Sequence, residues 1–300
     1  METNYHRPVL LKESVDGLNI VEGGIYVDAT FGGGGHSREI LQRLGPKGKL
    51  FAFDQDEEAL NNSLEDERFT LINENFRFLR QFLKFYGIKQ VDGILADFGV
   101  SSHQFDTAAR GFSIRFDADL DMRMSKRNSK SAYHVINTYS YDDLRRVLYA
   151  YGEVKRADAI AATIVEARSL EPIKTSADLK KVIKKFLPAF KENKILAQIY
   201  QAIRIEVNEE LVALEEFLAQ TPQLLKKGGR LSLISYHSLE DRLAKRFIQT
   251  GKFRGEIEKD FYGNTALPFK KVGKLIVPDA TEIKSNSRAR SGKLRIAERI

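Results

Sequence analysis

A run of four glycines beside an aspartate is the feature of this chain most able to do chemistry. The glycines are residues 32–35, and they follow an apolar stretch that contains Asp28. Glycine has no Cβ atom and accepts positive φ, so a nucleotide-like ligand can approach the backbone of such a loop. The dinucleotide spacing GxGxxG is incomplete, because Ser37 stands where the third glycine is needed. Asp28 would repel a pyrophosphate but attract ammonium and sulfonium groups, so the loop favours S-adenosylmethionine over NAD, with His36 near the cofactor.

Asp54 is the second acid placed to meet a bound nucleoside. It directly follows the apolar residues 50–53, about 20 residues after Gly34, where a carboxylate can accept hydrogen bonds from both ribose hydroxyls. Asp56 competes for this role, and Asp54 has the alternative of capping a helix that begins at residue 57. The agreement of strand, spacing and residue type favours ribose binding.

Asp97 ends the apolar stretch of residues 91–97 and is the candidate catalyst. A carboxylate at the carboxyl end of a central strand points into the ligand crevice. There it can hold the N–H of an amino group and turn the nitrogen lone pair toward a methyl donor. Gly99 lets the chain turn tightly afterwards, and Gln104 can reach back to the cofactor. The alternative role for Asp97 is that of a helix cap.

Further candidates follow two other strands. Phe76 could stack on an adenine face, although a place in the hydrophobic core is favoured for it. His237, Ser238 and Glu240 follow the fifth strand and are candidates for substrate contacts. Ser238 with Asp241 also predicts a capping box, so structural roles stay open for this cluster.

These residues depend on a sheet whose strands alternate with helices over the first hundred residues. Short apolar stretches predict strands, and amphipathic patterns between them predict helices, which together indicate a parallel sheet with right-handed crossovers. In such a sheet, ligands bind outside the carboxyl ends of the strands. The expected strands are residues 25–29, 49–54, 69–73 and 91–98, and the expected helices are residues 37–44, 57–64 and 78–86.

A helical segment interrupts this pattern. No strand is expected from residue 106 to residue 206, and capping signals at Ser140 with Asp143 and at Thr175 with Asp178 begin two helices, with a third at residues 157–168. The later elements are expected helices at 206–225 and 238–248, a loop at 250–271, and strands at 230–236, 274–277 and 294–296. We therefore expect a first sheet segment at residues 1–106, an inserted helical substrate-recognition domain at 107–206, and a second sheet segment with a basic tail at 207–300.

Composition indicates an intracellular globular protein with a polyanionic partner. The 300 residues are 42% hydrophobic, carry a net charge of +7 and include no cysteine, which excludes disulfides and thiolate metal sites. No apolar run approaches the length of a membrane span, so we expect a soluble, cytoplasmic protein without a membrane partner. Two basic segments could neutralise phosphates, one at residues 107–135 with Arg115 and Arg123 and one in the tail with Arg288 and Arg290. The alternative is a solvated surface with local pairs to Asp117, Asp119 and Asp121. Residues 115–123 are also a candidate lid over the substrate.

Together these motifs resemble the bacterial 16S rRNA cytosine N4-methyltransferases, the RsmH or MraW family, over nearly the whole chain. The similar strings begin with His6-Arg-Pro-Val-Leu-Leu11 and include Asp28-Ala-Thr-Phe-Gly-Gly-Gly-Gly-His-Ser37, Asp97-Phe-Gly-Val-Ser-Ser102, Leu120-Asp-Met-Arg-Met124, Gln201-Ala-Ile-Arg-Ile-Glu-Val-Asn208 and His237-Ser-Leu-Glu-Asp-Arg242. Several such strings in one order are more specific than any single motif.

The resemblance implies an α/β fold, with a Rossmann-like S-adenosylmethionine-dependent methyltransferase sheet and an inserted all-helical domain. It implies methylation of N4 of a cytosine in the decoding centre of small-subunit rRNA, and an assembled or partly assembled small subunit is the expected substrate. It places the cofactor against Gly34, Gly35, His36, Asp54, Phe76, Asp97 and Gln104. The Asp-Pro-Pro-Tyr type motif of many amino-methyltransferases is absent, so Asp97 is either a catalyst or a cofactor neighbour. Dimerisation stays open, with a homodimer as one possibility.

Two other classes of function compete with this interpretation. The first is a dinucleotide-dependent oxidoreductase, against which the incomplete glycine spacing and Asp28 both argue. The second is a non-catalytic RNA-binding ribosome assembly factor that keeps the methyltransferase fold. The presence of Asp28, Gly34, Asp54 and Asp97 argues against the second.

Overall fold

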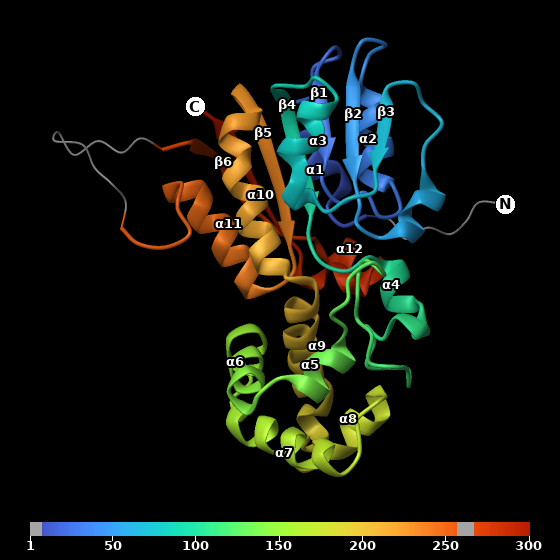
Figure 1. Cartoon of the computed structure of the whole chain (residues 1–300). Helices are drawn as coiled ribbons and strands as arrows, with labels where there is room; N and C mark the ends of the chain where they lie inside the picture. The colour runs from blue at the N-terminus through green and yellow to red at the C-terminus, as the bar shows by residue number, and fades with distance from the viewer. Residues whose placement is uncertain (1–7, 257–266) are drawn as a thin grey trace. The chain divides into compact units, whose positions relative to one another are not determined.

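The computed structural model describes residues 8–256 and 267–300, and the chain divides into two compact units (Figure 1). The sheet unit consists of Met1–Gly99 together with Leu211–Ile300, and the helical unit is Val100–Glu210. The start of the His6–Leu11 string and the middle of the loop expected at 250–271 lie outside the described residues.

The sheet unit is built on seven strands in the order β3-β2-β1-β4-β5-β7-β6. Neighbouring strands from β3 to β5 are parallel, whereas β7 is antiparallel to both β5 and β6. The strands are β1 (Ile25–Asp28), β2 (Lys49–Phe53), β3 (Phe69–Ile72), β4 (Val91–Asp97), β5 (Leu225–Ser235), β6 (Phe269–Ile276) and β7 (Lys293–Arg299). The predicted α/β class with a Rossmann-like sheet is thus confirmed, and the antiparallel strands are an addition to it.

Helices cover both faces of this sheet because its central strands are apolar on both sides. On one face, Phe53 and Ile94 share a buried core with residues of α3 (Leu79–Phe85), α10 (Glu210–Leu224) and α11 (Ser238–Thr250). On the other face, Leu50 and Leu95 pack with residues of α1 (Leu11–Asp16) and α2 (Gly35–Arg43). These two layers hold the strand ends in fixed positions. The remaining elements are η1 (Glu57–Asn62), η2 (Phe76–Phe78), α12 (Ala280–Ser285) and η6 (Ser287–Ser291).

The helical unit has a separate core. The capping signals predicted at Ser140 and Thr175 are confirmed, because each side chain accepts a hydrogen bond from the backbone N–H three residues later. Val147 and Ile199 are among the fully buried residues that join its helices. The elements are α4 (Ser102–Asp106), η3 (Ala108–Arg110), α5 (Ala132–Thr138), α6 (Tyr141–Gly152), α7 (Ala157–Leu170), α8 (Ser176–Val182), η4 (Lys184–Phe186), η5 (Ala189–Lys191) and α9 (Glu192–Asn208). Residues 100–210 contain no strand apart from one isolated bridge between Asp119 and Thr175.

Four predicted elements differ from the structure. The single helix expected at 206–225 is wrong, because Glu209 adopts φ 50° and separates α9 from α10. The helix expected at 57–64 is the shorter 3₁₀ segment η1, which Asp56 caps. The last two strands exist, but β6 and β7 extend well beyond the expected residues 274–277 and 294–296.

No helix in the described ranges is both long enough and apolar enough to span a membrane.

Candidate active site

Three aspartates occupy the carboxyl ends of three adjacent strands. Asp28 is the last residue of β1, Asp54 directly follows β2, and Asp97 is the last residue of β4. The chain continues from β1 to β2 on one side of β1, while β4 lies on its other side, so Asp28 and Asp97 flank the point where the strand order reverses. Ligands of open α/β sheets bind at this point, which makes the three aspartates the centre of the candidate site.

Asp28 is fully buried and is held by the residues that follow β1. Its Oδ1 accepts a 3.1 Å hydrogen bond from the backbone N–H of Thr30, and its Oδ2 accepts a 2.7 Å bond from the Ser37 hydroxyl. The Thr30 hydroxyl in turn accepts a 2.6 Å bond from the backbone N–H of Asp97. Thr30 therefore links the ends of β1 and β4 and fixes the two aspartates relative to each other.

Asp54 shapes the glycine loop. Its Oδ2 accepts a 2.7 Å hydrogen bond from the backbone N–H of Gly32, and its Oδ1 accepts a 2.8 Å bond from that of Asp56. Each carboxylate oxygen has a second lone pair, so these bonds leave acceptor capacity for a ligand. The structure therefore gives Asp54 a loop-organising role in addition to the predicted contact with ribose.

The last two glycines of the run are required by packing. Gly34 caps α2 with φ 74°, and a Cβ atom there would lie 2.9 Å from the ring of Phe31. A Cβ atom on Gly35 would lie 2.2 Å from the ring of Pro8. Both contacts are shorter than non-bonded carbon atoms tolerate, so the loop keeps this backbone path only with glycine at both positions.

His36 is buried beside these glycines. Burial lowers the pKa of its imidazole to about 4, so the ring is neutral at physiological pH. Its Nε2 atom has no hydrogen-bond partner within residues 8–256 and 267–300. A buried polar atom without a partner is uncommon, and it agrees with the prediction that His36 lies near a ligand.

Asp97 has a partner that the sequence did not indicate. The hydroxyl of Tyr236, the residue after β5, donates a 2.8 Å hydrogen bond to Asp97 Oδ1. Tyr236 has the position at which ligand-binding side chains gather, because it follows a parallel strand adjacent to β4. The sequence indicated Tyr236 only by its place before His237. Its hydrogen bond to Asp97, 139 residues away, cannot be predicted from spacing.

The three carboxyl groups share an environment that disfavours negative charge. Burial raises the pKa of Asp28 to about 6 and that of Asp54 to about 6. The pKa of Asp97 is raised to about 8, chiefly by burial and further by the charges of Asp28 and Glu240, while the hydrogen bond from Tyr236 opposes the rise. A site of this kind gains stability when a cation enters it, because a nearby positive charge favours the carboxylates.

Phe76 belongs to an aromatic cluster at the end of β3. Its ring centroid lies 5.2 Å from that of Phe217 and 6.1 Å from that of Phe98, in edge-to-face arrangements. Phe98 and Phe217 are buried, whereas Phe76 is only half-buried. Phe76 therefore packs on the core and also presents ring surface to solvent, so core packing and adenine stacking are compatible roles.

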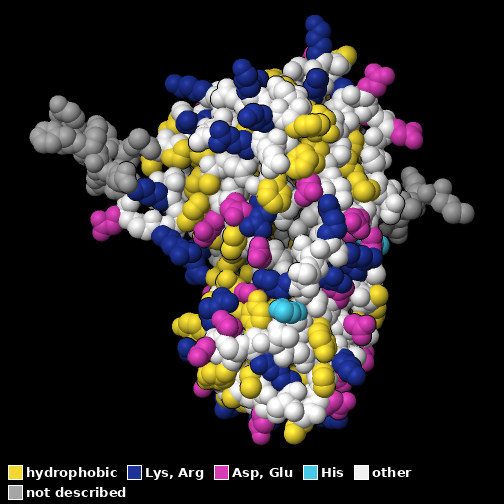
Figure 2. Space-filling view, viewed as in Figure 1, with side chains coloured by type: hydrophobic (Ala, Val, Ile, Leu, Met, Phe, Trp, Pro, Cys, Tyr) yellow, Lys and Arg dark blue, Asp and Glu magenta, His cyan; other side chains and the backbone are white. Residues whose placement is uncertain are grey.

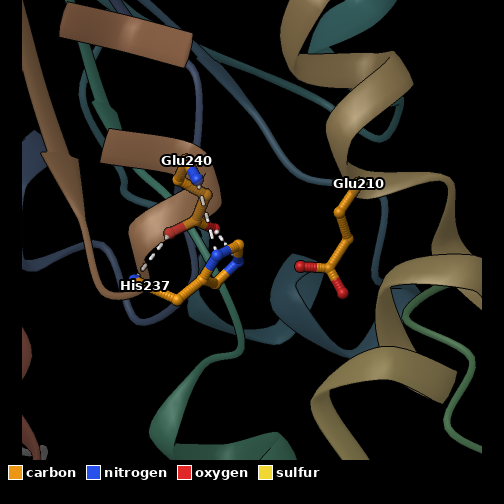
Figure 3. Close-up of side chains that lie close together, drawn as sticks. All are labelled: Glu210, His237 and Glu240. Atoms are coloured by element: carbon orange, nitrogen blue, oxygen red, sulfur yellow. Dashed lines mark hydrogen bonds and ion pairs between the residues drawn. The ribbon is translucent and has the colours of Figure 1, made fainter. Parts of the chain in front are cut away.

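His237 and Glu240 form a pair at the start of α11 (Figure 3). His237 Nδ1 accepts a hydrogen bond from the backbone N–H of Glu240, and Glu240 Oε2 accepts a 2.9 Å bond from that of Tyr236. The predicted capping box of Ser238 with Asp241 is therefore wrong, because His237 is the cap and Glu240 its third-position partner. Ser238 is exposed, and Asp241 instead accepts a 2.7 Å bond from Arg295.

The basic residues proposed for RNA contact lie in both units. In the sheet unit, Arg290 of η6 is exposed and Arg288 is half-buried. In the helical unit, Arg115 is exposed, but Arg123 donates a 2.6 Å hydrogen bond to Asp121 and another to the carbonyl of Asn128. Figure 2 shows Lys and Arg side chains interspersed with acidic ones over the surface of each unit. Arg123 thus has the local pairing that was the alternative to phosphate binding.

Gln104 also belongs to the helical unit. Its side-chain oxygen accepts a 3.1 Å hydrogen bond from the backbone N–H of Ser101, and its own backbone N–H donates to the Ser101 hydroxyl. The side chain therefore completes a capping box at the start of α4. This role was not expected, and contact with a cofactor stays a prediction.

The groups at the strand ends fit S-adenosylmethionine in charge and in hydrogen-bonding type. Carboxylates accept from an ammonium group and from ribose hydroxyls, and they are attracted to a sulfonium ion. Phe76 offers an aromatic surface beside them, and His36 offers an unpartnered buried nitrogen. The cluster of Asp28, Asp54 and Asp97 would instead repel the pyrophosphate of NAD.

Comparisons with known proteins agree with these features. Residues 3–300 match the model of the MraW methylase family. The chain is 69% identical to the ribosomal RNA small subunit methyltransferase H of Flavobacterium johnsoniae, with 99% of this chain and 98% of that protein covered. Proteins of the same name from Christiangramia forsetii and Bacteroides thetaiotaomicron are 64% and 53% identical, each with 99% of this chain and 98% of the relative covered.

Proposed function

Because the chain belongs to the MraW methylase family, we propose that it methylates N4 of one cytosine in the decoding centre of small-subunit 16S rRNA. The resemblance predicted from the motifs is confirmed at the level of the family. The chain is an S-adenosylmethionine-dependent methyltransferase of small-subunit rRNA. The N4 atom, the individual nucleotide and the roles of single residues are the proposal.

The pairing of Asp97 with Tyr236 is the observation that carries the choice of an amino group. Tyr236 occupies one oxygen of the Asp97 carboxylate, which leaves the other oxygen to accept an N–H from the substrate. An exocyclic amino group has two such hydrogens and so can be held while its nitrogen faces the methyl donor. A carbon or hydroxyl acceptor would instead need a group that removes a proton before attack.

S-adenosylmethionine supplies an electrophilic methyl group on a positively charged sulfur. We assign Asp54 to its ribose, Phe76 to its adenine, and Asp28 with Gly34, Gly35 and His36 to the amino-acid end and the loop around it. Gln104 of the helical unit completes the proposed set. Gln104 is included on the family resemblance, whereas the other assignments rest on the strand ends, the glycine loop, the ring of Phe76 and the charges described above.

Asp97 acts on the substrate by position and charge. The N4 lone pair of cytosine is delocalised into the ring, so holding one N–H turns the amino group and favours attack more than a strong base would. The carboxylate also stabilises the positive charge that develops on the nitrogen, and it is the nearest acceptor for the released proton. Tyr236 positions Asp97 and donates to its carboxylate form.

Substrate RNA is proposed to meet residues from both units. His237, Ser238 and Glu240 at the start of α11 are candidates for the cytosine, while Arg288, Arg290, Arg115 and Arg123 are candidates for phosphates. Reaching N4 requires the base to leave its stack, at roughly a few kcal/mol. A small subunit that is assembled or partly assembled can present the base by its shape, so we propose it as the substrate, in the cytoplasm.

Nucleoside analysis of rRNA from a strain that lacks the gene tests this function. The N4-methylated cytidine should be absent, return with the wild-type gene and stay absent with an Asp97→Asn variant. Return of the modified nucleoside with Asp97→Asn would remove Asp97 from the mechanism. Restored subunit assembly with no change in rRNA methylation would instead favour the assembly factor.

A further inference from the structure

We propose that α3 and the turn after it bind a second, unpaired segment of RNA, on a surface separate from the strand ends that hold the reaction. This surface, here called the α3 surface, consists of Arg80, Lys84, Phe85, Tyr86 and Lys89. The proposal rests on the proposed function for its RNA substrate. It assigns that substrate a second point of contact.

Exposed aromatic rings are the first observation. Phe85 is 81% exposed and Tyr86 is 43% exposed, although both are large aromatic side chains. An exposed aromatic ring offers a face on which an unpaired base can stack.

Tyr86 is anchored on the core and supports the ring of Phe85. Tyr86 packs on the buried Phe51 with 5.4 Å between ring centroids, and Phe85 packs edge-on against Tyr86 at 5.3 Å. The turn is closed by hydrogen bonds from the N–H of Gly87 to the carbonyl of Lys84 and from that of Ile88 to the carbonyl of Leu83. A fixed ring loses little conformational entropy on binding, which suits it to stack on a base.

Charge identifies the partner. Residues 75–91 contain Arg77, Arg80, Lys84 and Lys89 and no acidic residue. Arg77 is paired with Glu216, but Arg80, Lys84 and Lys89 are exposed and make no ion pair with a carboxylate of residues 8–256 or 267–300. Unneutralised cations near exposed aromatic rings suit a single strand, which offers both phosphates and unstacked bases. In Figure 2, hydrophobic side chains lie next to Lys and Arg side chains on the upper part of the face, where Figure 1 places α3.

The topology separates this surface from the reaction. The turn at residues 86–90 leads into Val91, the first residue of β4, whereas Asp97 is the last. The seven residues of β4 span about 20 Å. Phe85 therefore lies near the amino end of β4, whereas the three aspartates lie at the carboxyl ends of their strands. The nucleotides bound there are remote from the cofactor, so the α3 surface should affect RNA affinity and KM rather than kcat or cofactor affinity.

Phe85→Ala, Phe85→Leu and Phe85→Tyr test the aromatic contribution. Affinity is measured with a short fluorescent oligouridylate and, separately, with small ribosomal subunits from cells that lack the gene. We expect Phe85→Ala and Phe85→Leu each to weaken RNA binding about tenfold, and Phe85→Tyr to retain wild-type affinity. Affinity for S-adenosylmethionine and kcat should be unchanged in all three variants.

Lys84→Gln with Lys89→Gln tests the charge, and Lys245→Gln, an exposed lysine on α11, serves as the matched control. The double variant should reduce the slope of log affinity against log salt by about 1.4 for two phosphate contacts, and the control should leave it unchanged. Wild-type RNA affinity in both Phe85→Ala and the double variant would overturn the proposal. Wild-type affinity in Phe85→Leu would also overturn the proposal, because it would indicate that residue 85 meets an apolar protein partner. If the wild-type protein methylates no subunit and these variants still weaken RNA binding, the α3 surface is retained and the proposed function is rejected.

Discussion

Tyr236 and Asp97 are joined by a 2.8 Å hydrogen bond that links the carboxyl ends of β5 and β4. The bond stabilises the carboxylate form of Asp97 in a buried setting that otherwise favours the protonated form. The Tyr236 hydroxyl thus holds the proposed catalytic aspartate in place and leaves its second carboxylate oxygen for the substrate.

Asp97→Asn should reduce methyl transfer by at least about 100-fold, since the amide keeps the shape but cannot carry the charge or accept the proton.

Asp97→Asn should also stabilise the cofactor-free protein at pH 8. The pKa of Asp97 rises from 3.8 to about 8 on folding, so the folded state binds the proton more tightly and loses stability as pH rises between these values. Thermal unfolding should show a higher Tm for the variant at pH 8 and a much smaller difference near pH 4. An equal difference at both pH values would contradict this ionisation.

Tyr236→Phe should move the acidic limb of the pH–rate profile to higher pH. Loss of the hydroxyl removes a donor to the Asp97 carboxylate, so its pKa rises, by up to about one unit for a hydrogen bond of ordinary strength. Turnover needs the carboxylate and falls as pH decreases through this pKa. With cofactor bound, its positive charge should place the wild-type limb below pH 8. The profile of kcat/KM for RNA at saturating S-adenosylmethionine provides the measurement, and an unshifted limb would mean that Tyr236 has only a packing role.

Asp54→Ala should weaken cofactor binding by about 1–3 kcal/mol through the lost charge-assisted hydrogen bonds to ribose. Because Asp54 also accepts from the N–H of Gly32, part of this loss comes from the glycine loop. Isothermal titration with S-adenosylmethionine and with methionine separates the two, since only the former has a ribose. Unchanged affinity for S-adenosylmethionine would reject the assignment.

Arg290→Gln should reduce the salt dependence of RNA binding by close to one phosphate contact, a slope change of about 0.7–0.9. Arg290 is exposed on η6, whereas Arg288 is half-buried, so Arg290 is the cleaner probe of the tail. The comparison is Arg295→Gln, which breaks the ion pair with Asp241 and should lower Tm rather than change the salt slope. An unchanged salt dependence of RNA binding in Arg290→Gln would mean that the tail has a structural role and does not contact phosphate.

The sheet and its acidic strand ends could be predicted because their signals are local. Apolar stretches that end in Asp28, Asp54 and Asp97 specify both the strands and the edge at which these side chains meet. The antiparallel pairing of β7 with β5 depends on residues 230–235 meeting 293–298, a long-range choice that no local pattern encodes. Likewise Glu209 breaks the helix at φ 50° without the glycine that normally marks such a position.

Side-chain partners across the fold were the part of the site that could not be predicted. Tyr236 reaches Asp97 only because β5 pairs with β4, and His237 replaces Ser238 as a cap because Glu240 turns back to the N–H of Tyr236. Both facts follow from tertiary packing. Spacing placed Asp97 and His237 at the ends of neighbouring strands and left their side-chain contacts undetermined.

Methyl transfer from labelled S-adenosylmethionine to small ribosomal subunits from cells lacking the gene tests the central claim most directly. Naked rRNA and DNA serve as parallel acceptors, the Asp97→Asn variant serves as the control, and the product is digested to nucleosides. We predict label in N4-methylcytidine from subunit RNA with the wild-type protein and none with the variant. Absence of label in subunit RNA, from protein that still binds S-adenosylmethionine, would contradict the account.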